Sequence, residues 1–172
     1  AYWLEVLRQL DALDPGDLSA SKRDDYTIYR AQIESLAENI RLRGHLMPLN
    51  SDSSFYADLA MLPRQQPFAS GADYRRYIAR LREVPAYFEQ YTGLLREGLR
   101  RGITVPKATL LGRDAAIAAL ADADDPLASP FYAPFLVLPP GLPAGEAAAL
   151  RLAGRAAIVE AVLPAYAKLL AF

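Results

Sequence analysis

The 172-residue sequence contains no cysteine, which excludes disulfide bonds, thiolate nucleophiles and thiolate metal sites. It contains one histidine, His45, which excludes every metal motif that needs two imidazoles and every acid–base mechanism built on a histidine pair. Its 19 lysines and arginines nearly balance 20 aspartates and glutamates, and the net charge of -1 lacks the positive excess of nucleic-acid binders. We therefore expect no nucleic-acid partner.

Residues that favour β-strands are scarce, and this scarcity sets the expected fold class. Valine, isoleucine and threonine together number 17, whereas alanine and leucine, which are strong helix formers, number 58. Hydrophobic residues make up 52% of the chain, which is enough for a buried core. We predict an all-α fold, a multi-helix bundle of about six to eight helices with proline-rich connectors, as a single helical domain over residues 1–172.

The sequence also lacks an uninterrupted apolar run of the length that crosses a membrane. Residues 126–145 carry no charge over 20 positions, but six of these positions are proline. Because proline removes backbone donors and its ring clashes with the preceding turn, this segment is a poor spanning helix. We predict an apolar connector laid over the core and no transmembrane segment.

Apolar periodicity predicts the helices of the first half of the chain. One helix covers residues 3–13 and is broken by Pro15 and Gly16, and a longer one is closed by Gly44. The longer helix carries apolar residues at alternating spacings of three and four, the pattern of a helix packed on a neighbour. These residues are Tyr26, Tyr29, Ile33, Leu36 and Ile40. We expect His45, which follows this helix, to cap its terminal carbonyl groups rather than to act in catalysis.

In the second half, start and stop signals define further helices. Ser70 to Asp73 predicts one helix start, Pro85 predicts the next, and Gly102 predicts an end. The helices on either side of Pro85 are either separate or one kinked rod, because proline bends a helix as readily as it splits it. A short helix is predicted near residues 55–62. Another runs from Pro106 through Leu120 and is expected to fray at Asp122, Asp124 and Asp125. The final helix runs from Pro143 to Phe172 with a kink at Pro164.

No catalytic constellation is present. Neither a glycine-rich phosphate loop nor a serine nucleophile elbow occurs, and the adjacent acids at 24–25 and 124–125 do not face each other on a helix. Tyrosines at helical spacing, such as Tyr74 and Tyr77, favour core packing over a ligand groove. The arginines between residues 75 and 101 favour solvated helix faces over an anion site. We predict no catalytic, cofactor-binding or metal-ligating residue in this chain.

Several segments resemble one protein family and span nearly the whole chain in order. They are "LDPGDLSASKRDDYTIYRAQIE", "PLNSDSSFYADLAMLPRQQPFASGADYRRYIARL", "LLREGLRRGITVPK", "SPFYAPF" and "AAIVEAVLPAYAKL". They look like the amino-terminal helical half of the bacterial family called domain of unknown function 885, whose complete members resemble gluzincin-type zinc metallopeptidases. Where family members tend to have a glycine-containing turn, this sequence has Ser53, Ser54 and Phe55. The candidate groove or loop residues in this region are Asn50, Phe55 and Tyr56.

The resemblance implies a division of labour within a longer protein. In such peptidases an H-E-x-x-H helix supplies two zinc ligands and a general base, and no position of this sequence matches that motif. The resemblance therefore implies a fragment: no cofactor in this chain, zinc only in the missing carboxy-terminal part of the parent, and a non-catalytic role in the wall or lid of the substrate cleft. It also implies that the parent is exported or periplasmic.

The final helix carries large apolar residues on more than one face. They are Leu163, Tyr166, Leu169, Leu170 and Phe172. We therefore expect this helix to be covered by the missing part of the parent protein, to self-associate or to fray. The alternative function is a stand-alone helical protein-interaction or ligand-binding module that uses the apolar surface around Phe131–Leu138.

Overall fold

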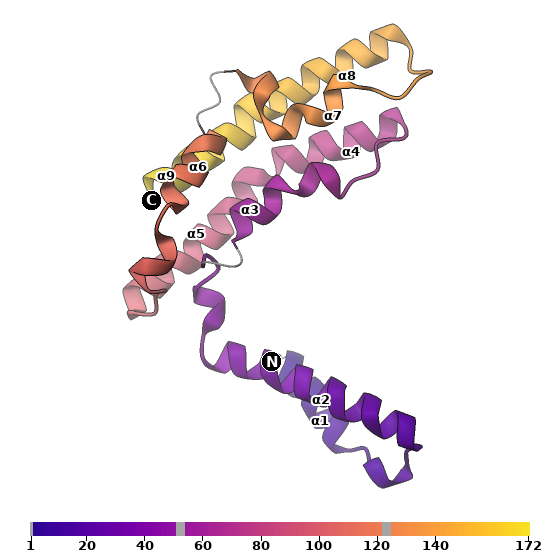
Figure 1. Ribbon diagram of the computed structural model, residues 1–172, viewed down its shortest axis with the longest axis vertical. Helices are drawn as coiled ribbons and strands as arrows, with labels where there is room; N and C mark the ends of the chain where they lie inside the picture. Colours follow the sequence, from indigo (N-terminus) through magenta and orange to yellow (C-terminus); the bar gives the residue numbers. More distant parts are fainter. Residues whose placement is uncertain (1, 51–53, 122–124) are drawn as a thin grey trace. The chain divides into compact units, whose positions relative to one another are not determined.

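The structure is a computed structural model that describes residues 2–50, 54–121 and 125–172 (Figure 1). The described residues form helices and turns, and their only β-type pairing is an isolated bridge between Leu49 and Ser54. The prediction of an all-α, multi-helix fold is confirmed. No helix among these residues has the length and apolarity needed to cross a bilayer.

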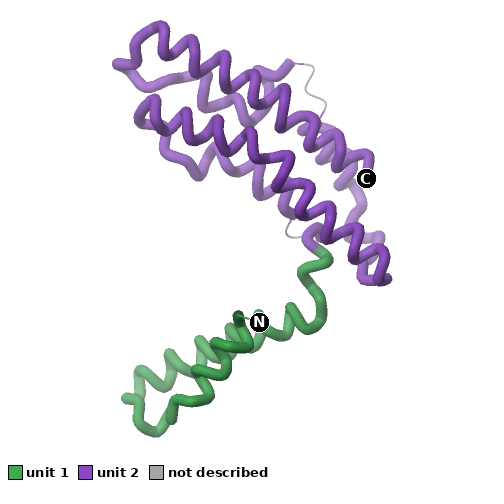
Figure 2. Tube along the Cα trace, turned by 180° about the vertical axis from the view of Figure 1, so that it is seen from behind, with its two compact units in different colours: residues 1–47 green, residues 48–172 purple. Residues whose placement is uncertain are grey.

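Contacts divide the chain into two compact units (Figure 2). Unit 1 comprises Ala1–Met47 and unit 2 comprises Pro48–Phe172. The single helical domain over residues 1–172 stays a prediction.

Unit 1 is a hairpin of two helices, α1 (Tyr2–Asp11) and α2 (Ala20–Arg41). The turn between them is held by side-chain caps, because Asp14 Oδ1 accepts from the Gly16 N–H at 2.7 Å and Ser19 Oγ accepts from the Lys22 N–H at 3.4 Å. The two helices bury Leu10 and Ile33 between them. Both predicted helices are therefore present in this unit.

The end of α2 is a backbone turn rather than a histidine cap. Arg43 adopts a left-handed conformation with φ of 60°, and the Leu42 N–H donates to the Glu38 carbonyl at 2.8 Å. His45 lies in the short η2 turn (Gly44–Leu46), is exposed, and makes no hydrogen bond with any described residue. The expectation that His45 caps the helix is wrong, because the turn directs its side chain to solvent.

Unit 2 contains two long helical rods that lie side by side. The helices of this unit are α3 (Phe55–Ala60), α4 (Gly71–Arg82), α5 (Val84–Arg101), α6 (Arg113–Ala121), α7 (Ala133–Leu136), α8 (Ala144–Ala157) and α9 (Leu163–Ala171). The first rod consists of α4 and α5 and the second of α8 and α9, with α4 along α8 and α5 along α9 (Figure 1). Helix α6 packs on α9.

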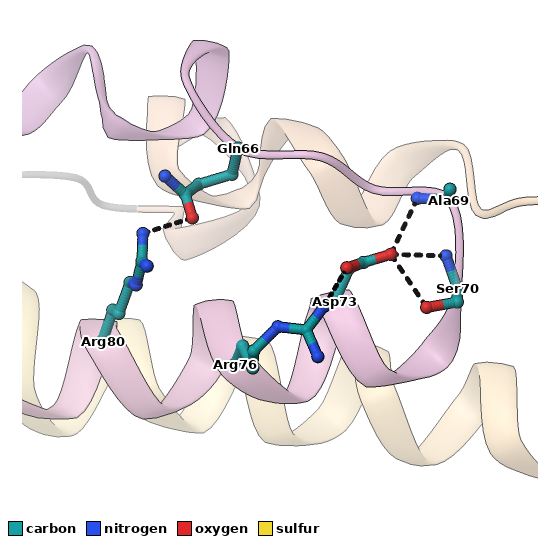
Figure 3. Close-up of polar contacts among 6 residues, drawn as sticks. All are labelled: Gln66, Ala69, Ser70, Asp73, Arg76 and Arg80. Atoms are coloured by element: carbon teal, nitrogen blue, oxygen red, sulfur yellow. Dashed lines mark hydrogen bonds and ion pairs between the residues drawn. The ribbon is translucent and has the colours of Figure 1, made fainter.

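Helix α4 begins where the sequence predicts, and its first turn is a complete capping box (Figure 3). Asp73 Oδ2 accepts from the Ser70 N–H and the Ser70 hydroxyl, both at 2.8 Å, and from the Ala69 N–H at 3.2 Å. The hydrogen bond from the Ser70 side chain contributes most to a lowered pKa of the Asp73 carboxyl group. Arg76 pairs with the other oxygen of Asp73, and Arg80 donates to Gln66 in the preceding loop. These contacts hold the loop along α4.

The boundary between α4 and α5 is a single residue, Glu83, with Pro85 in the first turn of α5. Helix α5 ends at Gly102, whose φ of 70° is the left-handed conformation that favours glycine. The predicted signals at Pro85 and Gly102 are confirmed. Of the two alternatives at Pro85, the structure has two separate helices, α4 and α5, which follow one another in the first rod.

The predicted helix from Pro106 through Leu120 is wrong at its centre. A short 3-10 turn, η4 (Lys107–Leu110), is followed by Gly112 with φ of 77°, and only then does α6 begin. A left-handed glycine interrupts the helical hydrogen bonds, so periodicity across it does not mean continuity. Of the acidic residues expected to fray this helix, Asp122 and Asp124 lie outside the described residues. Asp125 instead accepts from the Leu127 N–H at 2.9 Å in the next turn.

Helices α8 and α9 are continuous through a π-helical turn, η7 (Ile158–Val162). Pro164 lies in the first turn of α9 and has no backbone donor. A π-turn changes the hydrogen-bond register by one residue, so it provides a place where the helix can accommodate the missing bond. The irregularity expected at Pro164 therefore takes the form of a π-turn just before it.

Buried tyrosines connect the rods to the short helices and turns around them. The Tyr77 hydroxyl donates to the Phe131 carbonyl at 2.9 Å, that of Tyr74 donates to the Pro134 carbonyl at 3.0 Å, and that of Tyr166 donates to the Tyr56 carbonyl at 2.6 Å. Burial raises the pKa of Tyr77 and of Tyr166. The core interpretation is confirmed for Tyr74 and Tyr77, and the three hydroxyl groups donate to carbonyls in the short helices and turns that pack against the rods.

Replacing Tyr166 by phenylalanine is expected to lower the free energy of unfolding by about 1–3 kcal/mol, because it removes a buried donor from the Tyr56 carbonyl. Urea unfolding followed by circular dichroism measures this loss. The matched control is Tyr29→Phe in α2, where the side chain is exposed and the change is expected to stay within about 0.5 kcal/mol. Equal effects at the two positions would contradict the role given to the buried hydroxyl.

The aromatic residues of the proline-rich connector are buried, although most of its other residues are exposed. Phe131, Tyr132 and Phe135 belong to the core, and among the large apolar residues of the stretch 131–138 only Leu136 and Val137 are exposed. The prediction of a connector laid over the core is confirmed. The apolar surface expected around Phe131–Leu138 is correspondingly reduced, because the aromatic rings point inward onto α4 and α9.

Candidate functional site

A hollow of about 390 Å³ lies between α5 and α9 in unit 2. The residues from α5 recur every three or four positions and therefore lie on one face of that helix. Side-by-side packing of the two rods brings this face opposite α9. The lining residues are Pro85, Phe88, Glu89, Thr92 and Arg96 from α5, and Ala165, Lys168, Leu169, Ala171 and Phe172 from α9 and its end.

The floor of this hollow is apolar and well ordered by packing. Phe88 and Leu169 are buried, and the Phe88 ring meets that of Tyr166 at a centroid distance of 4.8 Å. Thr92 is also buried, and its hydroxyl donates to the Phe88 carbonyl within α5 at 2.7 Å. Because the hydroxyl proton is already used, Thr92 can offer only an acceptor to a ligand.

Charged groups lie on the rim. Arg96 Nη1 donates to Glu89 Oε1 at 2.8 Å, and the Arg96 guanidinium lies over the Phe172 ring at 5.4 Å from its centroid. Lys168, on α9, forms no ion pair within the described part of the chain. Two cations and one carboxylate leave the hollow with one excess positive charge. The arrangement can bind an anion beside an apolar group, but it contains no nucleophile or base placed for catalysis.

The structure places two of the predicted groove residues in the core next to this hollow. Phe55 stacks on Tyr91 with a centroid distance of 4.7 Å and meets Phe88 edge-on at 5.2 Å. Burial, followed by a hydrogen bond with Tyr91, raises the pKa of the nearby Tyr87 to about 12. Phe55 and Tyr56 are both buried, and Phe55 supports the hollow from behind through its contact with Phe88.

The third predicted groove residue, Asn50, is half-buried and follows Leu49, the residue that forms the bridge to Ser54. Asn50 does not line the hollow between α5 and α9. Ser53, which takes the place of the expected glycine turn, lies outside the described residues. A binding role for Asn50, Phe55 and Tyr56 stays a prediction.

Metal-ligating residues do not converge in the described ranges. Across residues 2–50, 54–121 and 125–172, no group of three or more His, Asp or Glu side chains comes close enough to hold a metal ion. The location of zinc in another part of a parent protein stays a prediction.

Sequence reasoning missed the residues of the hollow. Arg96 was included in an arginine-rich stretch, but Lys168 and Thr92 carried no signal that set them apart from other surface and core residues. Their spacing along α5 and α9 marks a common face of each helix, and this is a usable signal once the two helices are known to be neighbours.

A larger hollow of about 670 Å³ lies between α1 and α2 in unit 1. Its apolar lining comes mainly from Trp3, Leu4 and Leu7. The charges at its edge are already paired within α2, where Glu34 pairs with Arg30 and Glu38 with Arg41. We take the hollow in unit 2 as the candidate site because its Lys168 has no ion-pair partner among the described residues, whereas Arg41 at the hollow in unit 1 is paired with Glu38.

The terminal helix is less exposed than its sequence indicates. Tyr166 and Leu169 are buried within unit 2, whereas Leu170 and Phe172 remain 42% and 47% exposed. The apolar residues on several faces are thus explained largely by contacts with α5 and α6. Self-association through this helix stays a prediction, with Leu170 and Phe172 as the residues left to mediate it.

Helical rods with an apolar, positively charged hollow define an all-α protein with a candidate binding site. The family described as bacterial protein of unknown function (DUF885) matches residues 1–172, and the chain belongs to this family. The resemblance noted from the sequence is confirmed to that extent. Neither a curated protein nor a solved structure matches the chain.

Proposed function

We propose that the chain is the non-catalytic helical portion of a zinc metallopeptidase-like protein and forms part of the wall or lid of its substrate cleft. In this proposal the zinc-binding H-E-x-x-H helix belongs to further polypeptide of the same parent protein. The sequence resemblance supports the link to peptidases, and the family description itself leaves the activity open.

The observation that carries the proposal is the hollow between α5 and α9. Its apolar floor fits a substrate side chain, and Arg96 and Lys168 on its rim fit the negative charge of a peptide. A surface of this kind contributes substrate binding rather than bond cleavage, because it supplies neither a nucleophile nor a metal-bound water. Wall residues of a cleft are expected to act in this way.

The complete gene provides the test. Its product is expected to hydrolyse peptides in a zinc-dependent manner, and Arg96→Ala or Phe172→Ala is expected to raise KM roughly 3- to 10-fold with kcat nearly unchanged. The control is Arg155→Ala on α8, an exposed residue outside the hollow that is expected to change neither constant. A gene product without peptidase activity, or variants with unchanged KM, would contradict the proposal.

The alternative is a stand-alone helical protein-interaction or ligand-binding module, and the strong exposure of Leu136 and Val137 favours it. The reading frame distinguishes the two functions. Continuation past Phe172 into H-E-x-x-H supports the peptidase portion, and a stop codon there supports the stand-alone module.

A further inference from the structure

The charged side chains that line the hollow between α5 and α9 carry one excess positive charge. Arg96 shares its charge with Glu89, but Lys168 has three ammonium donors and no ion-pair partner in the described residues. An anion placed between the two helices would therefore meet the Lys168 ammonium group from α9 and the remaining guanidinium donors of Arg96. A carboxylate fits both groups, because guanidinium and ammonium groups form charge-assisted hydrogen bonds with it.

The apolar floor beneath these cations indicates which chemical group is joined to the carboxylate of the ligand. Phe88, Leu169 and Phe172 present an apolar surface, and the hollow of about 390 Å³ is near the lower end of small-ligand sites. Phe88 and Leu169 are already buried, but Phe172 is 47% exposed, so a free inorganic anion would leave the Phe172 ring in contact with water. An anion joined to an apolar group buries it.

Thr92 separates a peptide from other amphipathic carboxylates. Its hydroxyl proton is donated to the Phe88 carbonyl, so its oxygen can only accept a hydrogen bond from a ligand. The last residue of a peptide offers an amide N–H next to its carboxylate, whereas a fatty acid offers no donor. The donor and acceptor pattern of the hollow thus matches a peptide end.

We propose that the hollow between α5 and α9 binds the carboxy-terminal carboxylate of a peptide whose last residue is apolar. Lys168 and Arg96 bind the carboxylate, the terminal side chain lies on the Phe88, Leu169 and Phe172 floor, and Thr92 accepts the last amide N–H. The assignment deepens the proposed function by naming the substrate end that the wall receives. It rests on that function for its biological purpose but not for the binding itself.

Direct binding to the complete gene product, with zinc removed by a chelator so that no probe is cleaved, tests the proposal. The probes are fluorescein-labelled Ala-Ala-Leu with a free carboxylate, the same peptide with a terminal amide, and octanoate as competitor. Fluorescence anisotropy is expected to show the free acid binding at least 10-fold more tightly than the amide at low salt, with the difference falling as salt rises. Octanoate is expected to compete weakly.

Two variants assign the binding to this hollow. Lys168→Met keeps an exposed helical residue of similar length and is expected to weaken binding of the acid roughly 5- to 10-fold while leaving the amide unchanged. Lys107→Met in η4, outside the hollow, is the matched control and is expected to leave both peptides unaffected.

Three results would overturn the assignment: equal binding of the acid and the amide, no effect of Lys168→Met, or octanoate that competes as well as the peptide. These readouts involve no hydrolysis. If the complete gene product has no zinc-dependent activity, the proposed function is contradicted and the binding results still stand. If the peptide does not bind, the assignment of the hollow is contradicted, and the kinetic test of the proposed function is unaffected.

Discussion

Replacing Phe135 by alanine is expected to lower the free energy of unfolding by about 3–5 kcal/mol, the range for removing a large aromatic ring from a core. Phe135 has no solvent exposure and lies against the rings of Tyr74, Tyr77 and Tyr132 at centroid distances of 5.5, 5.9 and 5.3 Å. The substitution removes the ring that attaches the proline-rich connector to α4. Urea unfolding followed by far-ultraviolet circular dichroism measures the loss.

The neighbouring residue provides the control for this experiment. Leu136 is 61% exposed, so Leu136→Ala is expected to change the free energy of unfolding by no more than about 0.5 kcal/mol. Because the two positions are adjacent in α7, a general weakening of this short helix would affect both. Similar losses for the two variants would show that the Phe135 ring does not anchor the connector.

Gly154→Ala is expected to destabilise the protein by about 1–3 kcal/mol, although alanine is the better helix former. A Cβ atom added at Gly154 in α8 would approach Cε1 and Cε2 of Phe135 to 2.7 and 2.6 Å, closer than real Cβ atoms come to other heavy atoms. The ring is buried among tyrosines and cannot move aside without disturbing them. Thermal and urea unfolding measure the effect.

Gly145, a second glycine of α8, provides a control that tests helix propensity without a close contact. Gly145 has open space around the position of a Cβ, so Gly145→Ala is expected to be neutral or to stabilise the protein by up to about 1 kcal/mol. Combining Gly154→Ala with Phe135→Leu is expected to cost less than the sum of the two single changes, because the smaller side chain leaves room for the methyl group. Additive losses would contradict a direct clash.

Helix boundaries could be predicted where the signal is local. The capping box of Ser70 and Asp73 and the left-handed Gly102 act within one helical turn, and both are present in the structure as expected. Gly112 shows the limit of this reasoning. The apolar periodicity continues across Gly112, yet its positive φ separates η4 from α6. Hydrophobic periodicity does not report the backbone conformation of a single glycine.

The candidate site could not be predicted in the same way. Arg96 and Lys168 are far apart in the sequence, and only the pairing of α5 with α9 brings them to one hollow. Phe55 and Tyr56, which the sequence offered as groove or loop candidates, lie in α3 and are buried, and Phe55 packs on Phe88. Exposed and buried aromatic residues have the same appearance in a sequence when the neighbouring helix is not known.

The sequence by itself determined the all-α class, most helix limits and the absence of thiol and paired-histidine chemistry, because these follow from composition and from interactions within one turn. The tertiary structure alone decided that the connector buries its aromatic rings and that tyrosine hydroxyls satisfy its carbonyl groups. It also decided that Lys168 faces α5 without an ion-pair partner in the described residues. These features depend on which helix faces meet across long sequence separations, and such pairing depends on the packing of the whole unit rather than on local preference.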